Sequence, residues 1–189
     1  RSGWGDDAAF FGLRCGPVPG ESALAAFAPE ALITVLSGHS YPEQGNFTLQ
    51  HGGVDLLPNV EYARVKSTAF HNLVVFEGRD AQRGQWVGQL GEGGPWFNGR
   101  GYEQRVRPAR VLRREHTDDR HYYLCDLGGV YRLADARADD GAASPTSRRE
   151  LTFLPREGVA VVVDHVRLDH PRPARLNLLT GGVGGQARG

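Results

Sequence analysis

The chain has 189 residues, of which 40% are hydrophobic and 23% are charged. These values exclude a disordered or collagen-like chain, and the length suits one domain with a substantial core. Basic and acidic residues number 22 each, so the net charge is zero and no global attraction to nucleic acid or to an anionic membrane is expected. The sequence has no apolar run long enough for a transmembrane helix.

Strand patterns occur along the whole chain. Short runs rich in β-branched, aromatic or leucine residues are bounded by Gly, Pro, Asn or Asp, which is typical of strands. The predicted strands are residues 8–14, 32–36, 47–50, 54–57, 72–77, 105–113, 121–126, 151–154, 159–168 and 175–179. We therefore predict an all-β fold with little helix, an antiparallel β-sandwich of the supersandwich or jelly-roll kind with roughly ten or more strands.

The strand at 159–168 has the clearest pattern, because a continuous apolar run gives way to strict alternation. We expect it to be buried on both faces at its start and on one face at its end. Between the strands, residues 21–30 predict at most a short turn of helix, since the alanine-rich run ends at Pro29. The glycine-rich residues 78–101 predict an ordered loop, and residues 134–149 a solvated excursion.

The ends of the chain and its two cysteines complete the organisation. The chain has no methionine and opens on Arg1, so we interpret it as a piece of a larger protein. Residues 1–180 are expected to form the domain and residues 181–189 a flexible tail. Cys15 and Cys125 are far apart in sequence, which favours two independent buried thiols over a disulfide.

A polar cluster at predicted strand ends is the candidate site. His39, Tyr41, Glu43 and His71 carry groups that exchange protons when their environment permits it. In an extended segment the first three would share one face, whereas Pro42 indicates an edge or a turn. Spacing alone favours the simpler interpretation, in which these are partly exposed loop residues that cap strand ends.

Three separate segments resemble the β-sandwich domain of the heparinase II/III-like polysaccharide lyases. Residues 39–47 read His-Ser-Tyr-Pro-Glu-Gln-Gly-Asn-Phe, where the family pattern is His-x-His-Pro-Asp-Gln-x-x-Phe. Residues 59–62 read Asn-Val-Glu-Tyr where the pattern is Asp-x-Gly-Tyr, and residues 71–72 match its His-Asn. Residues 89–93 also look like the Gln-x-Gly-Glu-Gly segment of some members. The resemblance covers most of residues 1–180.

The resemblance implies a carbon–oxygen lyase that cleaves uronic-acid polysaccharides by β-elimination. A base removes the proton next to the uronate carboxylate, the negative charge that develops is neutralised, and the bridging oxygen is protonated as it leaves. By motif position the catalytic residues are His39 and Tyr41. The family's site is completed by an N-terminal helical toroid of the same chain, which these residues do not include, and the family is periplasmic or secreted.

The resemblance also implies substrate and metal contacts. The expected substrate-binding residues are Glu43, Gln44, Asn46 and Trp96. For Trp96, stacking on a sugar ring and anchoring of the glycine-rich loop are equally good interpretations. The family's zinc ligands fall on Tyr41, Asn59 and His71, and because two of these residue types are poor zinc ligands we expect an eroded site and no cofactor.

Two other functions fit the same sequence. One is a non-catalytic module that binds carbohydrate or packs against another domain, consistent with Tyr41 and Asn59 at metal positions. The other is a uronate C5-epimerase, since dermatan epimerase is related to this fold and begins with the same proton abstraction.

Overall fold

The computed structural model describes residues 2–16, 33–34, 41–59, 67–80, 84–89, 105–106, 109–131, 146–168 and 171–181. Strands dominate these residues, and the two helices within them are short 3₁₀ turns, η1 (Thr68–Phe70) and η2 (Gly128–Val130). Neither has the length or the apolar run that crossing a bilayer requires. The all-β prediction is confirmed.

Nine of the described strands have four or more residues, and three are shorter. The longer ones are β1 (Ala9–Leu13), β3 (Phe47–His51), β4 (Val54–Leu57), β5 (Val74–Asp80), β6 (Gly84–Val87), β8 (Arg110–His116), β9 (His121–Asp126), β10 (Thr146–Leu154) and β11 (Val159–Arg167). The short ones are β2 (Ile33–Thr34), β7 (Arg105–Val106) and β12 (Ala174–Leu176).

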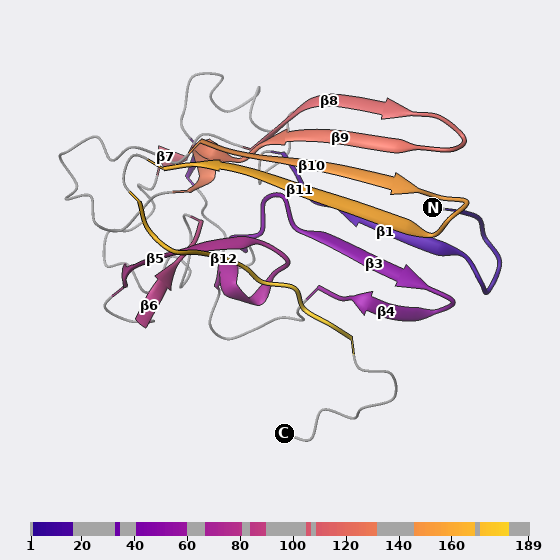
Figure 1. Ribbon diagram of the computed structural model, residues 1–189, viewed down its shortest axis with the longest axis horizontal. Helices are drawn as coiled ribbons and strands as arrows, with labels where there is room; N and C mark the ends of the chain where they lie inside the picture. The colour runs from indigo at the N-terminus through magenta and orange to yellow at the C-terminus, as the bar shows by residue number, and fades with distance from the viewer. Residues whose placement is uncertain are drawn as a thin grey trace.

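The strands form several antiparallel sheets (Figure 1). The largest has the order β11-β10-β9-β8, and two three-stranded sheets have the orders β1-β3-β4 and β12-β5-β6. β2 and β7 pair with each other. In Figure 1 the β1-β3-β4 sheet lies against one face of the four-stranded sheet, with β5 and β12 beside it.

Aromatic side chains join these two facing sheets. The ring of Phe11 on β1 stacks on Phe47 of β3 at 5.8 Å and on Phe153 of β10 at 5.6 Å between centroids. The buried cluster between the sheets consists of Phe47, Val74, Phe76, Ala109, Cys125, Leu127, Val130, Tyr131 and Leu151. Burial of these side chains is the main force that holds the layers together.

One strand and the first part of another were missed where the apolar pattern is weak. β6 lies inside the predicted glycine-rich loop, and its Trp86 packs under the guanidinium of Arg175 at 4.6 Å. β10 begins at Thr146, so the excursion predicted over 134–149 is wrong for its last residues. The inward positions there are Ser147 and Arg149, both of which are buried. Because both are polar, the sequence lacks the alternation of apolar and polar residues that predicts a strand.

The prediction for 159–168 has the right bounds to within a residue but the wrong burial. β11 is an edge strand of its sheet, and Val159, Val161 and Val163 are 44%, 46% and 44% exposed on its outer face. The run of apolar residues therefore reflects a row of exposed valines on the outer face of β11, and not burial of the strand on both faces. The helical turn predicted at 21–30 lies outside the described residues, as does the tail after Gly181.

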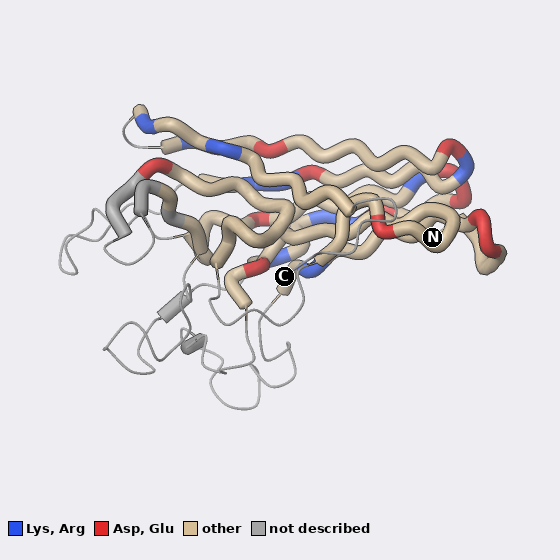
Figure 2. Tube along the Cα trace, turned by 90° about the horizontal axis from the view of Figure 1, so that it is seen from below, with Lys and Arg blue, Asp and Glu red and all other residues tan. Residues whose placement is uncertain are grey.

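Charges of both signs are interspersed along the described strands (Figure 2). Blue and red segments alternate in that view, and neither sign gathers over a whole sheet. Any attraction of an anion to this part of the chain must therefore come from a local group.

Candidate functional site

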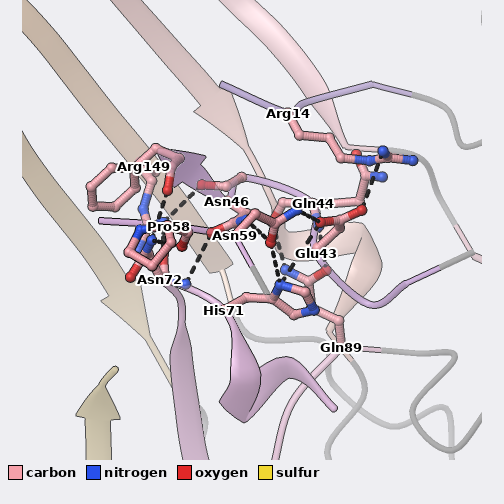
Figure 3. A network of polar contacts seen from close by, with 12 residues as sticks. Arg14, Glu43, Gln44, Asn46, Pro58, Asn59, His71, Asn72, Gln89 and Arg149 are labelled. Atoms are coloured by element: carbon pink, nitrogen blue, oxygen red, sulfur yellow. Dashed lines mark hydrogen bonds and ion pairs between the residues drawn. The ribbon is translucent and has the colours of Figure 1, made fainter. Parts of the chain in front are cut away.

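Three segments that are separate in sequence meet beside the start of β3 (Figure 3). They are the loop at 41–46, Asn59 two residues after β4, and His71 at the end of η1. Six predicted site residues therefore come together, namely Tyr41, Glu43, Gln44, Asn46, Asn59 and His71. His39 and Trp96 lie outside the described residues.

The 41–46 loop is a turn, one of the two possibilities that Pro42 indicated. The backbone N–H of Asn46 donates to the carbonyl of Glu43 at 3.0 Å, and Gly45 has a φ of +83°, a conformation that favours glycine. A side chain at Gly45 would also collide with Leu127. The turn points the side chains of this loop into the protein, where Glu43 and Asn46 are each 3% exposed.

His71 is placed by the short helix that precedes it. Ser67 caps η1 by accepting a hydrogen bond from the N–H of Ala69, and the N–H of His71 donates to the carbonyl of Thr68 at 3.1 Å. The His71 side chain is 1% exposed and lies against Asn59 and Glu43. The His-Asn pair therefore sits at a fixed point at the entry to β5.

The hydrogen bonds of Asn59 fix the tautomer of His71. Asn59 donates from Nδ2 to Oε2 of Glu43 at 3.1 Å, which sets the orientation of its amide. Its Oδ1 atom accepts from Asn46 Nδ2 at 3.0 Å and lies 3.0 Å from Nδ1 of His71. An amide oxygen is an acceptor, so Nδ1 of His71 carries the proton and Nε2 carries the lone pair.

The lone pair on Nε2 of His71 is buried and has no hydrogen-bond partner among the described residues. Burial, with a smaller contribution from the charge of Arg14, lowers the pKa of His71 from 6.5 to about 4. The imidazole is therefore neutral at pH 7. The Tyr41 ring meets it edge-on at 5.9 Å between centroids. Such a nitrogen can accept a proton or a ligand when a partner reaches it.

Arg14, at the end of β1, brings a positive charge to this network. Its Nη1 atom lies 3.2 Å from Oε1 of Glu43, and its side chain is 51% exposed while that of Glu43 is 4% exposed. Backbone bonds hold it there, because Arg14 donates to Asn46 O at 2.9 Å and accepts from Gly45 N at 2.6 Å. Sequence reasoning missed this residue, since an arginine after a strand is common in a chain rich in arginine.

Two glutamine side chains lock the loop from another side. The N–H of Gln44 donates to Oε1 of Gln89 at 2.8 Å, and Nε2 of Gln89 donates to the Gln44 carbonyl at 2.6 Å. Oε1 of Gln44 accepts from the N–H of Gly16 at 3.0 Å. Gln89 opens the segment that resembles Gln-x-Gly-Glu-Gly, and its side chain completes the backbone pairing of the motif loop.

Glu43, Gln44 and Asn46 therefore use their side chains within the protein. Asn46, in addition to its bond to Asn59, accepts from the N–H of Asn72 at 2.9 Å. Their predicted role as substrate contacts remains a prediction. In this arrangement they position the loop and the more exposed side chains beside it.

Arg149 on β10 supports the site from the core. It is 0% exposed, and its Nη1 donates to the carbonyls of Gly45 at 2.8 Å and Asn72 at 2.6 Å. Its Nε and Nη2 atoms form a bidentate pair with Asp164 on β11 at 2.7 and 2.8 Å. This pairing is what makes a buried guanidinium tolerable. No sequence signal distinguished Arg149, because its neighbours are polar.

The residues present do not fit the zinc site that the resemblance implies. The Oδ1 atom of Asn59 is a neutral donor and already takes two hydrogen bonds, and Nδ1 of His71 is protonated. Glu43 lies on the Nδ1 side of the ring, away from the lone pair. Among the described residues no three His, Cys, Asp or Glu side chains are grouped to hold a metal.

A scan against protein-family models finds no match for this chain, and no curated protein matches it. The functional assignment therefore depends on the motif resemblance and on the geometry of the site.

Proposed function

We propose that this chain is the β-sandwich domain of a lyase that cleaves uronic-acid polysaccharides by β-elimination. The observation that carries the proposal is the convergence of three motif segments, at 41–46, 59 and 71–72, into one hydrogen-bonded network. We further propose that the sheets belong to a sandwich of ten or more strands and that a helical toroid domain supplies the facing wall of the cleft.

Arg14 has the properties that recognition of a uronate requires. Guanidinium groups bind carboxylates in a bidentate manner, and one donor atom of Arg14 faces Glu43 while half of the side chain is exposed. Held against the carboxylate of the sugar, Arg14 would stabilise the negative charge that develops when the neighbouring carbon loses its proton.

The remaining roles follow from motif position and chemistry. His39 takes the proton from C5 of the uronate, electrons move to form the C4–C5 double bond, and the C4–O bond breaks. Tyr41, which is half-buried beside His71, donates a proton to the leaving oxygen. Glu43, Asn59 and His71 hold the loop that carries Tyr41, so their contribution is to positioning.

A non-catalytic carbohydrate-binding or packing module is the second candidate. The observation that favours it is the Asn59–His71 hydrogen bond, which replaces a metal bridge with a purely structural contact. Under this candidate Arg14 still binds acidic sugar, and no bond is broken.

One experiment separates these candidates. The chain, together with its helical domain, is incubated with polyuronates such as alginate and heparin while the ultraviolet absorbance of unsaturated uronate is followed. The lyase is supported if absorbance rises and the rise is lost in His39→Ala. Binding without a rise in absorbance supports the module, and solvent-deuterium uptake at C5 without chain cleavage supports an epimerase.

A matched pair of arginine variants tests the role of Arg14. Arg14→Ala should weaken polyuronate binding by about tenfold or more, the effect of losing one charge-assisted contact. Arg156→Ala is the control, because Arg156 is 70% exposed and pairs with Asp119 elsewhere on the surface. Equal binding by the two variants would contradict the proposed role.

A further inference from the structure

Two histidines lie next to each other at the tip of the hairpin that joins β8 and β9. His116 is the last residue of β8 and His121 the first of β9, and the two are partners in the antiparallel register. The turn between them is closed by the N–H of Thr117, which donates to the carbonyl of Arg120 at 2.8 Å. Side chains of directly opposite residues leave the same face of a sheet. The strand pairing therefore holds the two imidazoles side by side.

The surroundings of this pair support it on one side and leave it open on the other. The His121 ring stacks on Phe153 of β10 at 6.2 Å between centroids, and Phe153 is buried. The His116 ring meets Tyr123 edge-on at 5.2 Å, and His116 is exposed to solvent. One ring is thus fixed against the core, while the other is free to turn toward an incoming ligand.

We propose that His116 and His121 together bind a Cu²⁺ ion through one nitrogen of each ring. Imidazole is a good ligand for late transition metals, and Cu²⁺ forms the most stable complexes among the divalent ions of the first row. When two imidazole nitrogens lie about 2.1 Å from one ion, their ring centroids are roughly 4.5–5.3 Å apart. The centroids of His116 and His121 are 4.9 Å apart, with their planes at 88°. Water completes the coordination of the ion.

This pair is separate from the candidate lyase site and from the zinc positions of its motif. Arg149, which holds Gly45 of the site, pairs in register with Cys125, whereas His121 pairs with Phe153 further along β10. Zn²⁺ forms weaker complexes with nitrogen ligands than Cu²⁺ does, and its sites in proteins use three or four side chains. Zinc should therefore not bind the pair stoichiometrically. A bound Cu²⁺ would join β8 to β9 at the hairpin tip.

Calorimetric titration with copper(II) chloride tests the proposal. Every chain in the test carries Cys15→Ser, because the partly exposed Cys15 thiol would otherwise react with copper. His116→Ala and His121→Ala should each weaken Cu²⁺ binding by about tenfold or more, since even the loss of a group that supports a metal ligand costs about that much. His165→Ala is the matched control and should leave the affinity unchanged, because His165 is a histidine with a 55% exposed side chain on β11 that pairs with Glu150.

Two measurements on the chain with both histidines do not depend on how the variants fold. At one equivalent of Cu²⁺, its electron paramagnetic resonance spectrum should show coupling to two imidazole nitrogens. Its melting temperature should rise with Cu²⁺ concentration, because the ion binds the folded state. The proposal is overturned if the spectrum shows fewer than two imidazole nitrogens, or if the double variant His116→Ala with His121→Ala binds Cu²⁺ as tightly as the chain with both histidines.

Discussion

Nδ1 of His71 and Oδ1 of Asn59 lie 3.0 Å apart, at two positions where the lyase pattern implies ligands of one metal ion. A direct hydrogen bond at this place makes the contact between β4 and η1 independent of metal. It also fixes which imidazole nitrogen is protonated, and it keeps a neutral ring at the centre of a buried polar network.

Replacement of Asn59 should destabilise the protein. Asn59→Ala removes the acceptor for a buried N–H of His71 and one donor to Glu43, and an unsatisfied buried group costs about 1–3 kcal/mol. Urea unfolding measures the loss. Gln50→Ala is the control, because its side chain pairs with Asp55 on the surface and should change stability by less than about 0.5 kcal/mol. If Asn59→Ala lowers the free energy of unfolding by no more than Gln50→Ala does, the network does not contribute to stability.

The free energy of unfolding should decrease as the pH is lowered, because of His71. Its pKa is 6.5 in the unfolded chain and about 4 in the folded protein, so between these values the unfolded chain binds the additional proton. Stability from this residue is therefore complete above pH 6.5 and is lost as the pH falls toward 4, by on the order of 3 kcal/mol. Unfolding curves at several pH values should show this slope.

Two variants assign the pH dependence to its source. His71→Gln should remove this part of the slope, because glutamine does not titrate. His165→Gln should leave it in place, since His165 is 55% exposed. A slope that persists in His71→Gln would show that another group is responsible.

Loss of Arg149 should be among the most damaging single changes. Arg149→Met leaves Asp164 without its bidentate partner and removes the donor to two buried carbonyls, which typically costs about 3–5 kcal/mol. The second change Asp164→Asn should recover part of this loss, since it removes the unpaired charge. Thermal unfolding of the single and double variants measures both. A double variant as unstable as the sum of its parts would argue against the pair.

Zinc should neither bind stoichiometrically nor stabilise the wild-type protein. A ligand that binds the folded state raises the melting temperature with its concentration, and the donor set at Asn59 and His71 does not fit zinc. The double variant Tyr41→His with Asn59→Asp introduces the ligand types of the lyase pattern, and its melting temperature should rise when zinc is added. Elemental analysis that finds one zinc per wild-type chain would overturn the prediction.

The sequence was sufficient for the fold class and for most strands, because alternation and turn residues are local signals. The 121–126 strand matches β9 at both ends. The pattern failed at β10, where a buried arginine occupies an inward position, and at β11, where an outer valine row resembled burial on both faces. Both errors arise from tertiary partners that periodicity does not report.

At the site, motif spacing identified residues that do converge, but not how they are used. Glu43, a predicted substrate contact, is buried against Arg14 and Asn59, and its role toward substrate stays a prediction. Arg14 carries no local signal, because its partner Glu43 lies in a loop that is distant in sequence. Such residues are found only once the packing of the sheets is known.

The guanidinium of Arg149 serves the core and the candidate site at once, since it joins β10 and β11 to the carbonyls of Gly45 and Asn72. A substitution of Arg149 therefore changes the core and the candidate site together. Related chains that lack a histidine at the position of His39, the proposed base, should therefore still carry an arginine at this place, with an acid on the neighbouring strand. Such a pair would identify distant relatives of this chain better than the proposed catalytic residues would.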